Sequence, residues 1–262
     1  MENLKEILST LDRLLLTSFS KIPKNKKIGV LFSGGIDSSQ IAWYAQRQNL
    51  HPTLFTFGTE FSKDYDFAQR LSQDLKLDFV YLKLTKEEIS TALKPTRKIL
   101  QKKQIDDNLM QVSLSIGFFL IAGRAKEMGI DLFLSGQGSD ELFGGYNKYL
   151  KLLDDKKKLE QQMAQDTKNL FLVDVIRDRA MTETSGIEIY FPYLDQPVID
   201  YVQSLPLSLK INAQARKWLI RELGKTNGLP EYIFTRPKNA LQYSSGIQKI
   251  VEKLEKTRSH KN

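Results

Sequence analysis

The chain has no cysteine and only two histidines among its 262 residues. Without cysteine it can form neither a disulfide nor a thiolate metal site. The histidines, His51 and His260, have no acidic partners at catalytic spacing along the chain, so we assign them no role. Thiol chemistry is therefore excluded, and the function must be sought in other residue types.

Long hydrophobic runs are also lacking. The longest, such as 118–122, are far too short to cross a bilayer. The first six residues form a charged, amphipathic start and do not resemble a signal peptide. With 41% hydrophobic and 27% charged residues the composition is ordinary for a globular protein. We expect a cytoplasmic protein without a membrane partner.

The charge balance is basic, with a formal net charge of +8. Part of this charge would suit the binding of an anionic ligand. Much of it lies in lysine runs at 24–27, 156–158 and 253–261, which are typical of a solvated surface. A basic surface can also indicate RNA binding. Because aromatic residues do not alternate with these lysines, we do not expect a nucleic-acid partner.

The first informative segment is Ser-Gly-Gly-Ile-Asp-Ser-Ser at 33–39, directly after the apolar run 28–32. Glycines let the backbone turn tightly and bring its N–H groups against an anion, and the helix expected to follow adds its N-terminus. An ordinary tight turn is the alternative. Asp37 would repel a bare phosphate, so the segment predicts a nucleotide phosphate together with Mg²⁺.

A second turn repeats this arrangement. The apolar residues 132–134 lead into Ser-Gly-Gln-Gly-Ser-Asp-Glu at 135–141, followed by Gly144 and Gly145. Helix capping by the acids and a plain loop are the alternatives. In a parallel sheet the carboxyl ends of two such strands can lie side by side, so Asp37 and Asp140 could share one or two Mg²⁺ ions.

Together with three later stretches, the two turns resemble one family. The matching stretches, in the family's order, are 33–39 (S-G-G-x-D-S), 135–146 (S-G-E-G-S-D-E-x-F-G-G-Y), 186–195 (G-V-E-x-R-x-P-F-L-D), 217–221 (K-x-x-L-R) and 236–246 (R-x-K-x-x-x-x-x-x-x-G). The chain is similar to the synthetase domain of asparagine synthetase B and of the β-lactam and carbapenam synthetases, which are N-type ATP pyrophosphatases with a PP-loop. The resemblance covers about residues 20–250, nearly the whole chain.

The expected fold is α/β, with a parallel-sheet, Rossmann-like (HUP-type) PP-loop core for ATP followed by a mostly helical C-terminal half. We expect one domain over 1–262, comprising an N-terminal helix at 1–20, the α/β core at 21–147 and the helical half at 148–262. Apolar periodicity predicts strands at 28–32, 53–57, 78–83 and 132–134. It predicts helices at 4–19, 40–48, 64–76, 86–93, 111–128, 149–165, 170–181, 196–204 and 216–223, and no strand after residue 148.

The resemblance also implies the site residues. Those for ATP are Phe32, Ser33, Gly34, Gly35, Asp37, Ser38, Ser39, Phe57, Gly58, Ser135, Gly136 and Lys217. In the family the end of the second strand holds the adenine ring, which here places it at Phe57 and Gly58. The implied Mg²⁺ ligands are Asp37 and Asp140. The alternatives are a core phenylalanine for Phe57 and an exposed helix lysine for Lys217.

Three residues stand at the family's catalytic positions. Lys238 follows R-x, like the family's lysine, and an ammonium there would stabilise charge developing on the phosphate oxygens. Glu188 matches a glutamate that could orient the nucleophile, with a salt-bridged surface acid as the alternative. Gln137 replaces the glutamate of S-G-E-G, and glutamine can form hydrogen bonds but cannot take a proton. The identity of the carboxylate substrate therefore stays open, with aspartate as the default by resemblance alone.

The implied activity is a Mg²⁺- and ATP-dependent, amide-forming ligase that adenylates a carboxylate, releases pyrophosphate and AMP, and uses ammonia or an amine. Without cysteine the sequence cannot encode the family's glutaminase, so nitrogen would come from solution or from a separate glutaminase subunit. A homodimer is compatible with the resemblance. Two alternatives stay open: a PP-loop enzyme that modifies tRNA or a nucleobase, and a non-catalytic nucleotide-binding relative.

Overall fold

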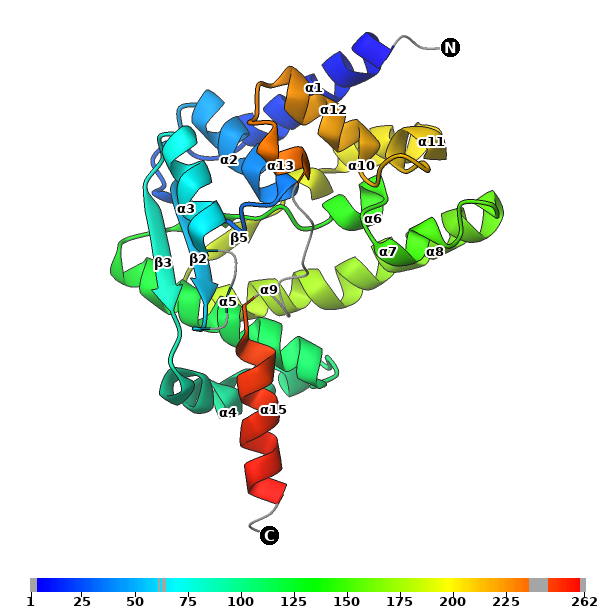
Figure 1. The fold of residues 1–262 in the computed structure, drawn as a ribbon. Coiled ribbons are helices and arrows are strands. Elements are labelled where there is room, and N and C mark those ends of the chain that lie inside the picture. The colour runs from blue at the N-terminus through cyan, green and yellow to red at the C-terminus, as the bar shows by residue number, and fades with distance from the viewer. Residues whose placement is uncertain (1–3, 61, 63–64, 236–244, 260–262) are drawn as a thin grey trace.

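The computed structural model describes residues 4–60, 62, 65–235 and 245–259 (Figure 1). The strands are β1 (Ile28–Leu31), β2 (Thr53–Gly58), β3 (Phe79–Lys83), β4 (Leu132–Leu134) and β5 (Glu188–Tyr190). The helices are α1 (Leu4–Ser20), α2 (Ile36–Arg47), α3 (Tyr65–Asp74), α4 (Lys86–Lys102), α5 (Leu109–Glu127), α6 (Ser139–Phe143), α7 (Asn147–Leu150), α8 (Lys156–Asn169), α9 (Val175–Glu183), α10 (Gln196–Ser204), α11 (Leu207–Lys210), α12 (Trp218–Thr226), α13 (Tyr232–Thr235) and α15 (Ile247–Ser259). A π-helical turn, η1 (Leu170–Asp174), joins α8 to α9, and a 3₁₀ turn, η2 (Pro192–Leu194), precedes α10.

A parallel sheet with the strand order β3-β2-β1-β4-β5 forms the centre of the fold. The chain builds outward from β1 in one direction through β2 and β3, and in the other through β4 and β5. The order therefore reverses between β1 and β4, and open α/β sheets bind their ligands at such a switch point. Both glycine-containing turns leave the sheet there, at 32–35 and 135–138.

Each face of the sheet carries its own layer of helices (Figure 1). Successive strand residues point to opposite faces, so Leu54 joins one core and Phe55 the other. One core packs against α1, α2, α3, α10 and α12, and the other against α4, α5, α9 and α15. Gly29 of β1 lies against the ring of Phe133 of β4, only 2.7 Å from where a Cβ would be, so only glycine fits at this position.

The expected α/β core with its parallel sheet is confirmed, but the prediction of no strand after residue 148 is wrong. Strand β5 (Glu188–Tyr190) pairs in parallel with β4 through Leu132 and Glu188, Phe133 and Ile189, and Leu134 and Tyr190. The strand has three residues, of which only Ile189 is buried. Such a short segment leaves no periodic pattern, and only the open edge of β4 gives it a partner.

Several helices differ from the sequence prediction. Helix α4 runs on to Lys102 and includes Pro95, whereas the sequence predicted an end at residue 93. The predicted helix at 149–165 is interrupted at 151–155, between α7 and α8. Helix α15 was not predicted; it packs its buried Ile247, Ile250 and Val251 in the core shared with α4 and α5. Within the described ranges, no helix combines the length and hydropathy that a membrane span requires.

Candidate active site

The turn after β1 is folded around its own hydroxyl groups. Gly34 has a φ of +69°, a conformation that favours glycine. The N–H of Gly35 donates to Ser33 Oγ (3.3 Å), and the N–H of Ser33 donates to Ser38 Oγ (3.2 Å). Gly35 is the N-cap residue of α2 and provides no side chain to cap it. The first N–H groups of α2 therefore remain suited to an anion held by this turn.

The turn after β4 lies directly against the first turn. A Cβ built on Gly136 would be 3.0 Å from Asp37 Cβ and 3.1 Å from the carbonyl carbon of Asp37. Ser139 at the start of α6 donates from its hydroxyl to Asp37 Oδ1 at 2.7 Å. Glycine at position 136 thus allows the two turns to approach, and Ser139 fixes them together.

Lys217 lies at the point where Asp37 and Asp140 converge. Its Nζ is 2.6 Å from Asp37 Oδ2 and 2.8 Å from Asp140 Oδ1, and its side chain is 4% exposed. Burial alone lowers the pKa of Lys217, but the charges of Asp140 and Asp37 outweigh it and raise this pKa above the usual value. The backbone of Lys217 is left-handed, with a φ of +54°. The alternative of an exposed helix lysine is therefore wrong.

The two carboxylates meet the requirement for a magnesium site. Oxygens from both lie within 2.8 Å of Lys217 Nζ, so the two carboxylates are close enough together to share a cation. Magnesium usually takes one or two protein carboxylates together with phosphate oxygens. In the described part of the chain no cluster of three or more acids or histidines forms a complete protein site. The pair Asp37 and Asp140 fits Mg²⁺ brought in with a nucleotide.

A cleft of about 820 Å³ opens above the two turns. We call the side formed by 33–38 and 135–140 its turn end. Residues from α5, α6, η1 and α9 form its helix end: Gln111, Glu141, Asp174 and Arg177. An apolar wall of Phe55, Phe57 and Phe118 lies between the strand ends and α5. The cleft is large enough for a nucleotide and a small second substrate.

Most of the predicted site residues gather in this cleft. Its lining includes Phe32, Ser33, Asp37, Ser38, Phe57, Ser135, Gly136, Gln137 and Asp140. Gly34 and Gly35 shape the turn, and Ser39 is buried and donates to the carbonyl of Gly35 at 2.7 Å. At Gly58 a Cβ would lie 2.5 Å from Ser62 Cβ, so this glycine permits a close contact behind the cleft. The ring of Phe57 occupies the space beside Gly117.

Glu188 is not brought to the cleft, which corrects its proposed catalytic place. It begins β5, opposite Leu132 at the amino end of the sheet, whereas the turns lie at the carboxyl end. Its side chain is 70% exposed and pairs with Lys26 at 2.5 Å. The salt-bridged surface acid is therefore the right interpretation. Lys238 lies outside the described residues.

Glu141 and Tyr146 were not predicted, although both lie in the 135–146 stretch. The hydroxyl of Tyr146 donates to Glu141 Oε1, and Glu141 is 3% exposed. Burial, helped by the neighbouring charge of Asp140, raises the pKa of Glu141 to about 7. Burial and the charge of Glu141 also raise the pKa of Tyr146. The side chain of Glu141 thus changes charge near neutral pH.

Asp174 and Arg177 come from a segment without any recognised pattern. Arg177 is 2% exposed and donates from Nη1 to Asp174 Oδ1 (2.5 Å) and to Gln111 Oε1 (2.7 Å). Its Nε donates to Asp178 Oδ1 at 2.9 Å. The only signal in the sequence is the group of charges at 174, 177, 178 and 179 directly after the apolar residues 170–173.

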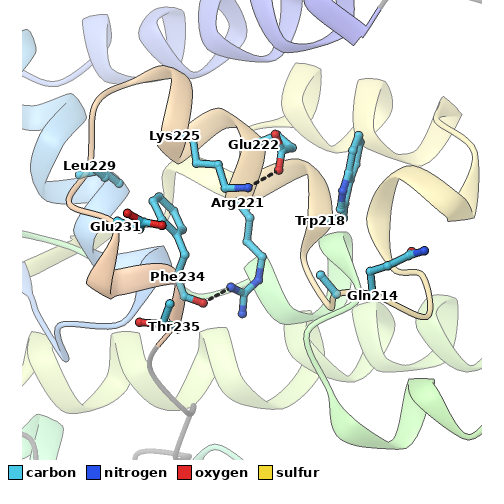
Figure 2. A pocket seen from close by; sticks show the side chains of 10 residues that line it. Gln214, Trp218, Arg221, Glu222, Lys225, Leu229, Glu231, Phe234 and Thr235 are labelled. Atoms are coloured by element: carbon cyan, nitrogen blue, oxygen red, sulfur yellow. Dashed lines mark hydrogen bonds and ion pairs between the residues drawn. The ribbon is translucent and has the colours of Figure 1, made fainter.

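A second pocket of about 540 Å³ lies beside α12 and α13 (Figure 2). Arg221 points into it and donates to the carbonyl oxygens of Phe234 and Arg216, while Lys225 pairs with Glu222 at 2.7 Å. None of the predicted site residues in the described ranges lines this pocket. The arginine of the K-x-x-L-R stretch therefore ties α13 to the segment that precedes α12.

The model of the asparagine synthase family matches residues 11–160 and 151–260. The chain belongs to the asparagine synthase family. The matched residues include both acid-bearing turns of the cleft.

Individual relatives agree with the family. The chain is 32% identical to a putative glutamine-hydrolysing asparagine synthetase of Methanocaldococcus jannaschii, over 94% of this chain and 51% of that protein. It is 30% identical to the glutamine-hydrolysing asparagine synthetase of Gallus gallus, over 88% of this chain and 41% of the relative. The chain spans about half the length, or less, of these relatives. Among solved structures it is similar to an NMN synthetase from Francisella tularensis, with a TM-score of 0.47, 15% identity, and coverage of 91% of this chain and 76% of that one.

Proposed function

We propose that the chain catalyses Mg²⁺- and ATP-dependent amide formation of the asparagine synthetase type. It adenylates a carboxylate, aspartate by default, and transfers the acyl group to ammonia or an amine. The observation that carries this proposal is the convergence of Asp37 and Asp140 at the switch point of the sheet. Membership of the asparagine synthase family supports it.

The reaction has two displacements. A carboxylate oxygen attacks the α-phosphorus of ATP, the bond to the bridging oxygen breaks, and pyrophosphate leaves with the electron pair. The nitrogen lone pair then attacks the acyl carbon of the acyl-adenylate. AMP leaves with its electron pair, and the amide nitrogen loses a proton to solvent.

The residues of the turn end bind and orient the phosphates. Backbone N–H groups at the start of α2 and the hydroxyls of Ser33 and Ser38 donate to phosphate oxygens. Asp37 and Asp140 would hold Mg²⁺, whose charge offsets that of the phosphates. The apolar wall at Phe57 would take the adenine ring. From its sequence pattern alone, Lys238 would stabilise the charge that develops on pyrophosphate.

The proposal also covers the source of ammonia, the cellular location and the oligomeric state. Ammonia would come from solution or from a separate glutaminase subunit, and the chain would act in the cytoplasm, alone or as a homodimer. The sequence offers no cysteine nucleophile for glutamine hydrolysis. Gln137 lines the cleft, where its carboxamide can form hydrogen bonds with the acceptor but cannot accept a proton from it.

The decisive measurement is the exchange of labelled pyrophosphate into ATP, with a panel of carboxylates and with or without ammonium. We expect exchange that depends on one carboxylate, with an amide and AMP appearing once ammonium is added. Asp37→Asn should abolish exchange, because it removes a ligand of the cation, whereas Asp200→Asn on the exposed face of α10 should leave it unchanged. ATP binding without exchange by any carboxylate would indicate a non-catalytic relative, and RNA that stays bound through purification would favour a tRNA-modifying enzyme.

A further inference from the structure

The helix end of the cleft is built around a buried guanidinium whose charge is already neutralised. Arg177 donates to Asp174, Asp178 and Gln111 at 2.5 to 2.9 Å. In addition, its Nη2 forms an ion pair with Asp178 Oδ1 at 2.7 Å. Two carboxylates therefore face one cation. A carboxylate of a substrate would have to displace one of these buried partners before it could pair with Arg177.

The other cations in or beside the cleft are also paired or lie at the turn end. Lys148 pairs with Asp166 at 2.7 Å. Lys217 is bound by Asp37 and Asp140. Arg216 donates to the carbonyl oxygen of Gly145, the glycine that packs against Asp140 and Lys217. The described cations thus leave the helix end without a counter-charge for a second carboxylate.

Asp174 is the acid of this network that the cleft can reach. Its side chain is 25% exposed, whereas that of Asp178 is fully buried. It ends the π-helical turn η1, and such turns inside α-helices frequently occur at functional sites. Its charge is near enough to Tyr146 to help raise the pKa of that phenol, although burial is the main cause. Asp174, Glu141 and Tyr146 all line the same cleft.

We propose that the helix end binds the carboxylate substrate. Asp174 there selects a substrate that carries an ammonium group besides its reacting carboxylate, and no second carboxylate. This assignment rests on the proposed function and changes its substrate from a dicarboxylate such as aspartate to an amino monocarboxylate. The ammonium would lie against Asp174, and the reacting carboxylate would point toward the turn end.

The test compares three acids with the same four-carbon chain: succinate, butyrate and 4-aminobutyrate. Their binding is measured by titration calorimetry on the full chain in the presence of Mg²⁺ and α,β-methylene-ATP, so that binding is read without turnover. We expect 4-aminobutyrate to bind about tenfold more tightly than butyrate, and succinate at least about tenfold more weakly than 4-aminobutyrate, since one charge at a partly buried site has an effect of this size.

The informative variant is Asp174→Asn, which leaves Arg177 with one carboxylate partner. It should lose the preference for 4-aminobutyrate and gain affinity for succinate, and a gain of binding cannot result from misfolding. Asp200→Asn, an exposed aspartate on α10 that accepts from Gln196, serves as the control and should keep the wild-type order.

Three outcomes would overturn the assignment: succinate or aspartate binding as well as 4-aminobutyrate, an unchanged order in Asp174→Asn, or no binding of any of these acids. Pyrophosphate exchange with the same acids separates this assignment from the proposed function. If 4-aminobutyrate binds in the expected order and no carboxylate supports exchange, the charge selection stands and adenylation fails.

Discussion

The turn end and the helix end of the cleft are held together by different kinds of contacts. The turn end is formed by two tight turns of short residues, with glycines at 34 and 136 and with hydroxyl groups that bond within the first turn. The helix end is formed by long side chains of α5, α6, η1 and α9, held by ion pairs. The geometry of the turn end therefore depends on close backbone contacts, whereas the charge of the helix end depends on single side chains that one substitution can change.

The largest effect is expected at Lys217, which joins the two turns. Lys217→Met leaves Asp37 and Asp140 facing each other without a cation, and removing one partner of a buried ion pair typically costs about 3–5 kcal/mol. We expect the free energy of unfolding, measured with urea, to fall by that amount without Mg²⁺ and to recover in part when Mg²⁺ is added.

Lys225→Met is the matched control. Its pair with Glu222 has a similar separation of 2.7 Å but is exposed, with 55% of the lysine side chain accessible. Exposed pairs contribute about 0–1 kcal/mol, so this variant should stay near wild type. Equal losses in both variants would mean that Lys217 does not neutralise the two carboxylates.

The next effect concerns pH and the helix end. Because the pKa of Glu141 is raised to about 7, the folded protein binds a proton that the unfolded chain releases near pH 4.5. Stability should therefore fall as pH rises from about 4.5 to about 7, by about 3 kcal/mol for this group. Glu141→Gln should remove this part of the pH dependence, measured by unfolding without nucleotide or Mg²⁺.

A suitable comparison for that variant is Glu127→Gln, which changes an exposed acid paired with Arg124. It should leave the stability-versus-pH curve within about 1 kcal/mol of wild type. If Glu141→Gln keeps the full wild-type dependence of stability on pH, Glu141 is ionised in the folded protein across this range. The helix end then carries the negative charge of Glu141 as well.

A smaller effect is expected from a change of backbone geometry that alters the turn end but not the helix end. Gly136→Val places a side chain against Asp37, at 3.0 Å already for the Cβ, and should push the two turns apart. A displacement of about 1 Å can reduce a rate by about 100-fold, so pyrophosphate exchange should fall by that factor. The order of binding among the four-carbon acids, which depends on Asp174, should remain.

Gly123→Ala on α5 is its control, since a Cβ there would meet only Ser185 Oγ at 3.9 Å. This variant should keep full exchange and gain up to about 1 kcal/mol of stability, because alanine restricts the unfolded chain more than glycine does. Full exchange by Gly136→Val would show that the close approach of the turns is not required.

The same difference between the two ends explains what could be predicted from the sequence. Strands β1 to β4 and both turns were predictable because buried runs, glycines and acids occur close together in the chain. Strand β5 and the network of Asp174, Arg177 and Gln111 were not, since residues 111 and 177 meet only after α5 and α9 pack together. Lys217 was recognised by its pattern, but its contacts with Asp37 and Asp140 depend on a left-handed backbone conformation that lysine rarely adopts.

The smallest effect is expected at Glu188, which belongs to neither end of the cleft. Glu188→Gln removes an exposed pair with Lys26 at the amino end of the sheet and should change the free energy of unfolding by less than about 1 kcal/mol. Exchange should stay within about twofold of wild type, measured alongside Gly136→Val. A large loss of exchange with normal stability would place Glu188 in the reaction, and since the sheet separates it from both turns, the position of β5 would then have to be wrong.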